Sequence, residues 1–261
     1  MLLPTVRAVR YVAPLREGGS LPGLMEADDD GTYVVKYRGA GQGAKALVAE
    51  VLAGEIGRAL GLPVPDAVLL DLDPAFARLE PDYEIGHLLR ASEGLNYALD
   101  YLPGSITYDL LVPPEPDPEF AADVVWFDAF VSNVDRTARN TNMLEWHGRL
   151  WLIDHGASLY FHHDWGDVMA RSGDPFSRVT EHVLLPFTGD LEAADTRARA
   201  RLSAEVFEAI VAVVPELWLT DHYADQPPEA VRRAYLDYLM ARLDGSHAFR
   251  EEAARARAQL V

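Results

Sequence analysis

The sequence contains no cysteine. Disulfides, thiolate zinc sites and cysteine nucleophiles are therefore excluded, and the absence fits a reducing compartment. The sequence also has no run of about 18 apolar residues, the length that a membrane-spanning helix needs. Its first residues lack the basic and then apolar stretches of a signal peptide. We therefore expect a cytoplasmic protein that does not act at a membrane.

Basic residues are scarce: 23 Lys and Arg stand against 41 Asp and Glu, which makes the net charge −18. Such a surface repels nucleic-acid phosphates and anionic lipids. The small basic cluster at Arg197 to Arg201 has acidic neighbours, which favours a solvated helix face. Direct nucleic-acid binding is therefore not expected.

The remaining composition is that of an ordinary soluble protein, with 49% hydrophobic and 25% charged residues in a chain of 261. That length suits one domain of two lobes, or two small domains that share a cleft. The chain shows no internal repeat. Four prolines between Val112 and Pro118 predict a connector. We therefore expect an N-lobe over residues 1–111 and a C-lobe over residues 112–261.

The apolar patterns predict a mixed α and β structure. Strands are expected over residues 6–12, 32–37, 67–72 and 96–102, with helices over 44–60, 82–94 and 119–132. The stretch 15–30 is rich in Gly, Pro and Asp and predicts a loop. Residues from about 200 onward look helical. Three tryptophans are expected in the core, namely Trp126, Trp146 and Trp151.

Two carboxylates and an amide are expected to converge in the second half of the chain. Asp135 stands five residues before Asn140 in a loop after the helix 119–132. A hairpin with its tip at His147 and Gly148 then brings Asp154 back beside Asn140. Hard oxygen ligands of this kind suit Mg²⁺, which completes its shell with water and substrate phosphates. This region is therefore a candidate magnesium and phosphate site.

A lysine in the first half of the chain fits the same chemistry. Lys36 ends a short strand, and the next helix carries acidic residues. This is the arrangement that positions the α- and β-phosphates of ATP in kinases. Glu50 is the favoured partner of Lys36. Glu55 stays open as a rival, because it lies nearer the middle of the apolar stripe and a buried carboxylate needs a cation.

Two other metal sites are less favoured by the pattern. Zinc ligands are conceivable among His155, His162, His163, Asp164 and Asp167, but ordinary loop residues lining a cleft are favoured. The run Asp28 to Gly31 lacks the ligand spacing and closing Glu of a calcium loop, so a hairpin turn is favoured. Asp135 and Asn140 alone would read as loop caps. Together with Asp154 and Lys36 they indicate a site.

With these residues in view, the chain resembles the HipA-like kinase family, compact relatives of protein kinases and phosphatidylinositol kinases. The resemblance covers roughly residues 30 to 165. The matching segments are Tyr33 to Lys36, Glu50 through Leu60 to Pro65, Asp128 to Phe130, Asn133 to Arg136, Asn140, and Asp154 to Gly156. It implies an α+β, two-lobed protein-kinase-like fold, with a small mixed N-lobe sheet carrying one helix and a mostly helical C-lobe.

The resemblance also implies roles for individual residues around ATP and Mg²⁺. Asp135 would be the catalytic base, flanked by Asn133 and by Arg136, for which a structural ion pair is favoured over a contact with Asp135 or substrate. Asn140 and Asp154 would hold Mg²⁺. Lys36 would contact the ATP phosphates, and Glu50 would orient Lys36.

Adenine contacts are implied on the strand that ends at Asp100 and Leu102. Ser20, within the glycine-rich stretch Gly18 to Gly23, would cover the phosphates. The sequence departs from protein kinases in three ways: it lacks G-x-G-x-x-G, it has Asn133 in place of His, and it lacks an Ala-Pro-Glu marker.

The acceptor therefore stays open between a protein Ser or Thr and a small-molecule hydroxyl. Two rival functions also stay open. A nucleotide-binding pseudokinase would bind ATP without transferring phosphate, although every catalytic position is filled. A metal-dependent phosphohydrolase would use the same carboxylates but would leave Lys36 unexplained.

Overall fold

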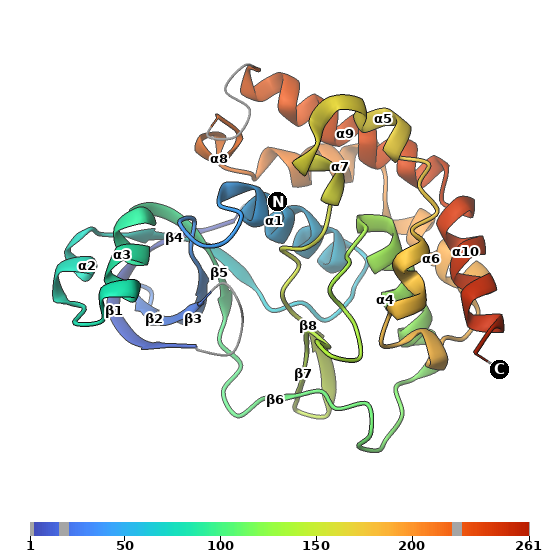
Figure 1. Cartoon of the computed structure of the whole chain (residues 1–261), viewed down its shortest axis with the longest axis horizontal. Helices are drawn as coiled ribbons and strands as arrows, with labels where there is room; N and C mark the ends of the chain where they lie inside the picture. Colours follow the sequence, from blue (N-terminus) through green and yellow to red (C-terminus); the bar gives the residue numbers. More distant parts are fainter. Residues whose placement is uncertain (1–2, 16–20, 221–225, 261) are drawn as a thin grey trace.

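The structure, a computed structural model, describes residues 3–15, 21–220 and 226–260. A barrel of strands forms one lobe, helices form most of the other, and α1 lies between them (Figure 1). The strands are β1 (Thr5–Pro14), β2 (Gly23–Ala27), β3 (Thr32–Lys36), β4 (Ala67–Leu72), β5 (Gly94–Asp100), β6 (Ile106–Thr107), β7 (Met143–Trp146) and β8 (Arg149–Leu152).

The α-helices are α1 (Ala44–Ala59), α2 (Ala75–Leu79), α3 (Tyr83–Ala91), α4 (Pro118–Val131), α5 (Val168–Arg171), α6 (Leu191–Arg201), α7 (Ala204–Ala212), α8 (Glu216–Thr220), α9 (Pro228–Asp244) and α10 (His247–Ala258). Short 3-10 helices are η1 (Tyr160–His163), η2 (Trp165–Asp167), η3 (Ser177–Glu181) and η4 (Leu185–Phe187). No helix in the described part of the chain is long and apolar enough to cross a membrane.

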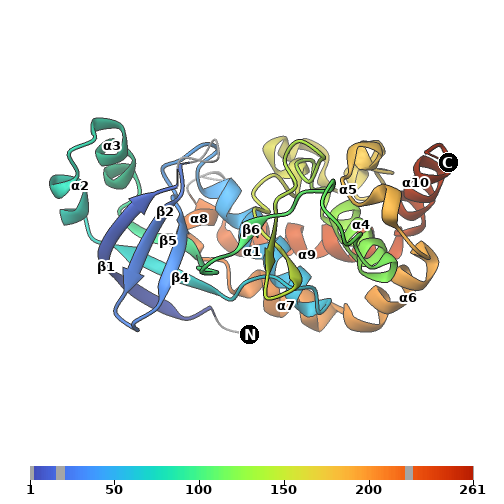
Figure 2. The same cartoon turned by 90° about the horizontal axis from the view of Figure 1, so that it is seen from below.

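The N-lobe strands close into a barrel in the order β1-β2-β3-β5-β4, which corrects the expected small sheet. The pairing is mixed as expected, because β1 runs parallel to β4 and the other neighbours are antiparallel. Closure depends on β1, whose residues Thr5–Arg7 pair with β4 while Ala8–Pro14 pair with β2. Two register shifts lie in the part of β1 that pairs with β2, and Figure 2 shows β1 curving along the barrel.

The stretch 15–30 was expected to be a loop, but it contains β2. Gly23, Met25 and Ala27 of this strand face the barrel core. The strand starts with Gly23 directly after Pro22, two residues typical of turns, which hid its alternation. Gly23 is needed because a Cβ there would collide with the Tyr37 hydroxyl.

The other N-lobe expectations need small changes. The helix expected over 82–94 is α3, which begins after Asp82, whose carboxylate caps the backbone N–H groups of Glu84 and Ile85. The five-residue helix α2 was not expected. The strand expected over 96–102 is β5, shifted two residues toward the N-terminus at both ends. The helix expected over 44–60 is confirmed as α1.

The C-lobe core is built around α4, whose residues from Val124 to Val131 are all buried. Trp126 of α4 is buried and stacks on Phe130, with ring centroids 5.2 Å apart. The prediction that Trp146 and Trp151 are also core residues is wrong. Both are half-exposed and contact each other on the hairpin of β7 and β8, at 5.6 Å between centroids. In the described part of the chain that small sheet has three strands, β6-β7-β8, and neither ring packs against the main core.

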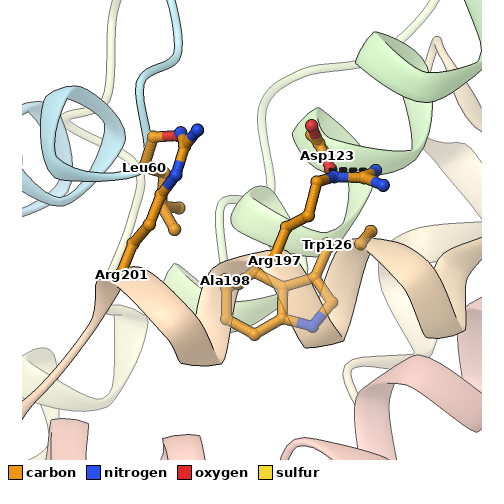
Figure 3. A pocket seen from close by; sticks show the side chains of 7 residues that line it. Leu60, Asp123, Trp126, Arg197, Ala198 and Arg201 are labelled. Atoms are coloured by element: carbon orange, nitrogen blue, oxygen red, sulfur yellow. Dashed lines mark hydrogen bonds and ion pairs between the residues drawn. The ribbon is translucent and has the colours of Figure 1, made fainter.

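The basic cluster on α6 is not simply a solvated face. Figure 3 shows Arg197 facing Asp123 and Arg201 reaching toward Leu60. Arg197 Nη2 lies 2.6 Å from the Asp123 carboxylate, and Arg201 donates to the Leu60 carbonyl. The cavity among these side chains measures only 20 Å³, about the space of one water molecule. These arginines therefore join α6 to α4 and to the end of α1.

Candidate active site

A cavity of 420 Å³ lies between the lobes and is lined by four of the predicted site residues. From the barrel lobe and α1 it is lined by Lys36 and Glu50, and from the helical lobe by Asp135 and Asp154. Lys36 ends β3, Glu50 lies in the middle of α1, and Asp154 follows β8. Three separate parts of the chain thus bring charged groups to one wall.

Lys36 is the centre of an ion-pair cluster. Its Nζ atom lies 2.7 Å from Asp154 Oδ1 and 3.3 Å from Glu50 Oε1. The other oxygen of Glu50 accepts a hydrogen bond of 3.0 Å from the backbone N–H of His155. Glu55, the rival partner, pairs with Arg58 on its own helix. The contact to Lys36 therefore belongs to Glu50.

Burial and charge oppose each other in this cluster. Burial alone would lower the pKa of Lys36, but Glu50 and then Asp154 outweigh it and raise that pKa above its ordinary value. Burial raises the pKa of Glu50 to about 7, against the opposing attraction of Lys36. Burial would also raise the pKa of Asp154, but Lys36 reverses that effect and lowers it. Lys36 is thus held as an ammonium group beside an ionised Asp154.

The turn after β8 fits closely against α1. Asp154 adopts a left-handed backbone conformation with φ of 55°, which is uncommon for a residue other than glycine. Two residues later, a Cβ on Gly156 would stand 3.3 Å from Glu50 Oε1, closer than ordinary van der Waals contact. Glycine at this position lets the turn approach the Glu50 carboxylate.

Asp135 is held by amide side chains on its own loop. Asn140 donates from Nδ2 to Asp135 Oδ2 at 2.9 Å, and Asn142 donates to the same oxygen at 3.2 Å. Asn142 also donates to the Asp135 carbonyl at 3.1 Å, and the Asp135 N–H donates to Asn133 Oδ1 at 3.1 Å. Asn140 thus lies beside Asp135, whereas its expected approach to Asp154 stays a prediction. Asn142 was not singled out in the sequence, although it directly precedes β7.

A buried polar network holds the loop that carries Asp135. Arg136 Nε lies 2.6 Å from Asp128 Oδ2, and His182 Nε2 lies 2.9 Å from the same oxygen. Asn133 Nδ2 donates to Asp128 Oδ1 at 2.9 Å. Burial would raise the pKa of Asp128, but Arg136 and then His182 hold it well below its usual range. Asn133 and Arg136 thus anchor the loop on Asp128.

Three predicted binding residues do not line this cavity. Asp100 ends β5, where it pairs in register with Tyr33, and Leu102 is buried beyond the strand. Neither residue is among the described residues that form the cavity wall, and the same holds for Asn140. Ser20 lies outside the described residues.

The histidines of the second half do not form a zinc site in the described parts of the chain, where no group of three or more His, Asp or Glu residues is arranged to hold a metal ion. His162 instead contacts the Tyr235 hydroxyl at 3.0 Å and His163 at 3.2 Å. The ring of His155 packs edge-on against Phe127, and burial lowers its pKa to about 3. Its two ring nitrogens have no hydrogen-bond partner among the described residues.

Lys36 at the end of a strand pairs with Glu50 on a helix and with Asp154 from the facing lobe. Asp135, in a loop, lines the same cavity. This arrangement defines a kinase-type fold and site. A solved structure agrees in fold: the Helicobacter pylori proinflammatory kinase CtkA matches with a TM-score of 0.54 at 13% identity, covering 98% of this chain and 99% of that one. The sequence profile of the HipA-like kinase family matches residues 9–252. The chain therefore belongs to the HipA-like kinase family, which confirms the resemblance seen in its motifs and extends it into the C-terminal helices.

Two further structures show a weaker likeness. The Golgi casein kinase with Mn and ADP bound matches at 9% identity and a TM-score of 0.46, over 96% of this chain and 73% of that one. Another structure of the Golgi casein kinase matches at 9% identity and a TM-score of 0.42, over 96% and 72% of the two chains. No match was found among curated protein sequences.

Proposed function

We propose that this kinase transfers the γ-phosphoryl group of ATP to a hydroxyl acceptor, with Mg²⁺ bound at the nucleotide phosphates. One observation carries the proposal. The cluster of Lys36, Glu50 and Asp154 forms one wall of a cavity that Asp135 also lines. The same cavity is therefore lined by a cation that would bind phosphates, a carboxylate that would bind a metal ion, and a candidate base.

The donor groups fit a hard divalent cation. Asp154 offers a half-exposed carboxylate, and Asn140 and Asn142 offer amide oxygens beside Asp135. Mg²⁺ needs only one or two protein carboxylates, because water and phosphates supply its other ligands. We assign Asp154 and Asn140 as the residues that would hold it. The ion would neutralise charge on the β- and γ-phosphates.

The remaining residues would position and activate the reactants. Lys36, oriented by Glu50, would bind phosphate oxygens of ATP. The acceptor oxygen would attack the γ-phosphorus while the bond from that phosphorus to the β–γ bridging oxygen breaks and ADP leaves. The acceptor proton would pass to the Asp135 carboxylate, which Asn140 and Asn142 hold in place. Positioning and charge stabilisation supply most of the catalysis in such transfers.

For adenine we propose the segment that ends β5, including Asp100 and Leu102. The backbone between β5 and β6 leaves the barrel, and β6 already pairs with β7 of the facing lobe. We propose that the lobes join in this segment, a few residues before the proline-rich stretch that suggested a division at residue 111.

Product analysis tests the proposal against its rivals. The purified protein is incubated with ATP labelled in the γ-phosphoryl group, Mg²⁺ and dephosphorylated casein or small hydroxyl compounds. We expect labelled acceptor and ADP, and a loss of at least about 100-fold in Asp135→Asn, the scale of a missing general base. Free phosphate released from small phosphoesters would support a phosphohydrolase instead. ATP binding without labelled acceptor, including the protein itself, would support a pseudokinase.

A further inference from the structure

A second cavity of 330 Å³ adjoins the first on the helical-lobe side. The two cavities share three lining residues, Val134, Tyr160 and Arg178. Val134 directly precedes Asp135 in the chain, so the second cavity begins one residue from the proposed base. We call it the acceptor cavity. A molecule bound there would lie beside the space into which Asp135 faces.

The floor of the acceptor cavity is aromatic. Phe161, Phe176 and Tyr238 line it, and each is more than nine-tenths buried. Phe161 and Tyr238 stack with ring centroids 3.8 Å apart. Tyr160 stands at the border with the first cavity and is 55% exposed. Such a surface suits a flat or apolar body, because aromatic rings gain by stacking and by apolar burial.

The rim carries two guanidinium groups in a protein of net charge −18. Arg171 pairs with Asp164 at 2.6 Å, and Arg178 pairs with Glu181 at 2.8 Å, all four side chains being at least 42% exposed. Exposed pairs of this kind contribute little stability, so an anionic group can take over a guanidinium at small cost. The nearby carboxylate of Asp174 already accepts from the Phe176 N–H at 2.6 Å.

The backbone around this cavity is held in an uncommon conformation. Ser132 and Phe176, which line it, have φ of 55° and 54°, and Leu159, beside Tyr160, has φ of 54°. Left-handed conformations are costly for bulky residues and gather at functional sites. Leu159 is kept in place by a hydrogen bond of 2.7 Å from its N–H to the Val131 carbonyl. The backbone conformation of these cavity walls therefore costs conformational energy.

We propose that the acceptor cavity binds the molecule to be phosphorylated, and that this molecule is a small hydroxyl compound with a flat apolar body and one anionic group. The inference rests on the proposed phosphotransfer at Asp135. A volume of 330 Å³ falls at the lower end of the range of roughly 300–1,000 Å³ for small-molecule sites. The aromatic floor would take the apolar body, Arg171 or Arg178 would take the anion, and the hydroxyl would point past Val134 toward Asp135.

The test uses 3-phenyllactate, which has a phenyl ring, a hydroxyl and a carboxylate, and phenylalaninol, which has a phenyl ring and a hydroxyl but carries an amine and no carboxylate. Ser177 is exposed and lines the cavity, and Thr180 is exposed on the same 3-10 helix but does not line it. Calorimetry would compare the wild type, Ser177→Trp and the matched control Thr180→Trp, with and without Mg²⁺ and a non-hydrolysable ATP analogue.

We expect 3-phenyllactate to bind the wild type and Thr180→Trp equally, and Ser177→Trp at least tenfold more weakly. Phenylalaninol should bind the wild type at least tenfold more weakly than 3-phenyllactate. The proposal is overturned if 3-phenyllactate does not bind the wild type, if Ser177→Trp binds it normally, or if phenylalaninol binds better. Phosphorylation of dephosphorylated casein at the same rate by wild type and Ser177→Trp would also overturn it.

These outcomes are separable from a failure of the proposed function. The titrations without nucleotide judge the acceptor cavity alone. If the ATP analogue does not bind the wild type with Mg²⁺, the phosphotransferase proposal fails, whatever 3-phenyllactate does. If the analogue binds and only the 3-phenyllactate results differ from those expected, the proposal for the acceptor cavity is wrong and the phosphotransferase proposal is unaffected.

Discussion

Lys36 and Asp154 come from opposite lobes, yet their charged atoms lie 2.7 Å apart. Glu50 completes the contact from α1 at 3.3 Å, and its second oxygen holds the backbone next to Asp154. One ammonium group therefore links the end of β3, the middle of α1 and the turn after β8. Removing Lys36 would leave the buried Glu50 carboxylate without its cation, which is costly.

The two buried glutamates of α1 offer a matched pair of variants. We predict that Glu50→Gln lowers phosphotransfer at least about 100-fold, because Lys36 loses the carboxylate that orients it. Glu55→Gln should keep phosphotransfer within a few-fold, because Glu55 pairs with Arg58. Rates under saturating ATP and Mg²⁺ measure both. Equal losses in the two variants would mean that the Glu50 contact is structural only.

The two amides that hold Asp135 should differ in their effect on metal use. We predict that Asn140→Ala raises the Mg²⁺ concentration for half-maximal rate about 10- to 100-fold, the scale of a lost metal contact. Asn142→Ala should instead lower the maximal rate about 100-fold at every Mg²⁺ concentration, because Asn142 holds both the carboxylate and the carbonyl of Asp135. Rates measured across a Mg²⁺ series decide. A shifted Mg²⁺ requirement in Asn142→Ala alone would reassign the metal contact to Asn142.

His155 should make stability depend on pH. Burial lowers its pKa to about 3 in the folded protein, whereas an unfolded His titrates near 6.5. The unfolded chain therefore binds an extra proton below pH 6.5, so this contribution is full above that pH and is lost as the pH falls toward 3.

We predict that the stability gain of His155→Phe over wild type grows by about 2 kcal/mol from pH 7 to pH 5. The phenyl ring can keep the edge contact with Phe127. Denaturant unfolding of both proteins at the two pH values measures the difference. A gain that does not change with pH would contradict a buried, neutral His155.

The network of Asp128, Arg136 and His182 beside the loop of Asp135 should behave as a buried ion pair. We predict that Asp128→Asn lowers the free energy of unfolding by about 3–5 kcal/mol at pH 7, because Arg136 keeps its charge without a partner. The pKa of Asp128 is depressed in the fold, so its contribution is full above about pH 4 and is lost at lower pH. The cost of Asp128→Asn should therefore shrink in acid.

Asp123→Asn is the matched control, because Asp123 makes a half-exposed pair with Arg197. Its cost should stay near 1 kcal/mol or less. Urea titrations from pH 7 to pH 3 test both variants. Similar costs for Asp123→Asn and Asp128→Asn at pH 7 would show that the buried network contributes little.

The sequence predicted those parts of the site that depend on local pattern. Each of these site residues is marked by a local pattern in the sequence: Lys36 ends a strand, Asp135 stands five residues before Asn140, and Asp154 follows a hairpin. The regular elements around them, α1 and α4, also have apolar residues at helical spacing. The choice between Glu50 and Glu55 required coordinates, since a helical pattern does not show which carboxylate faces another lobe.

The parts that the sequence missed depend on contacts between distant residues. Closure of the barrel joins Thr5 to Leu69, and neither residue signals the other. His182 reaches Asp128 across 54 residues, from a segment without a readable motif. The acceptor cavity likewise draws its walls from segments that only the fold brings together.

We propose that Asp154 makes this site a Mg²⁺-dependent ATP site. ATP would be titrated by calorimetry into the wild type and Asp154→Ala, each with and without Mg²⁺. We predict binding to the wild type that requires Mg²⁺ and is lost in Asp154→Ala. No ATP binding to the wild type in either condition, or equal Mg²⁺-dependent binding by Asp154→Ala, would contradict the account.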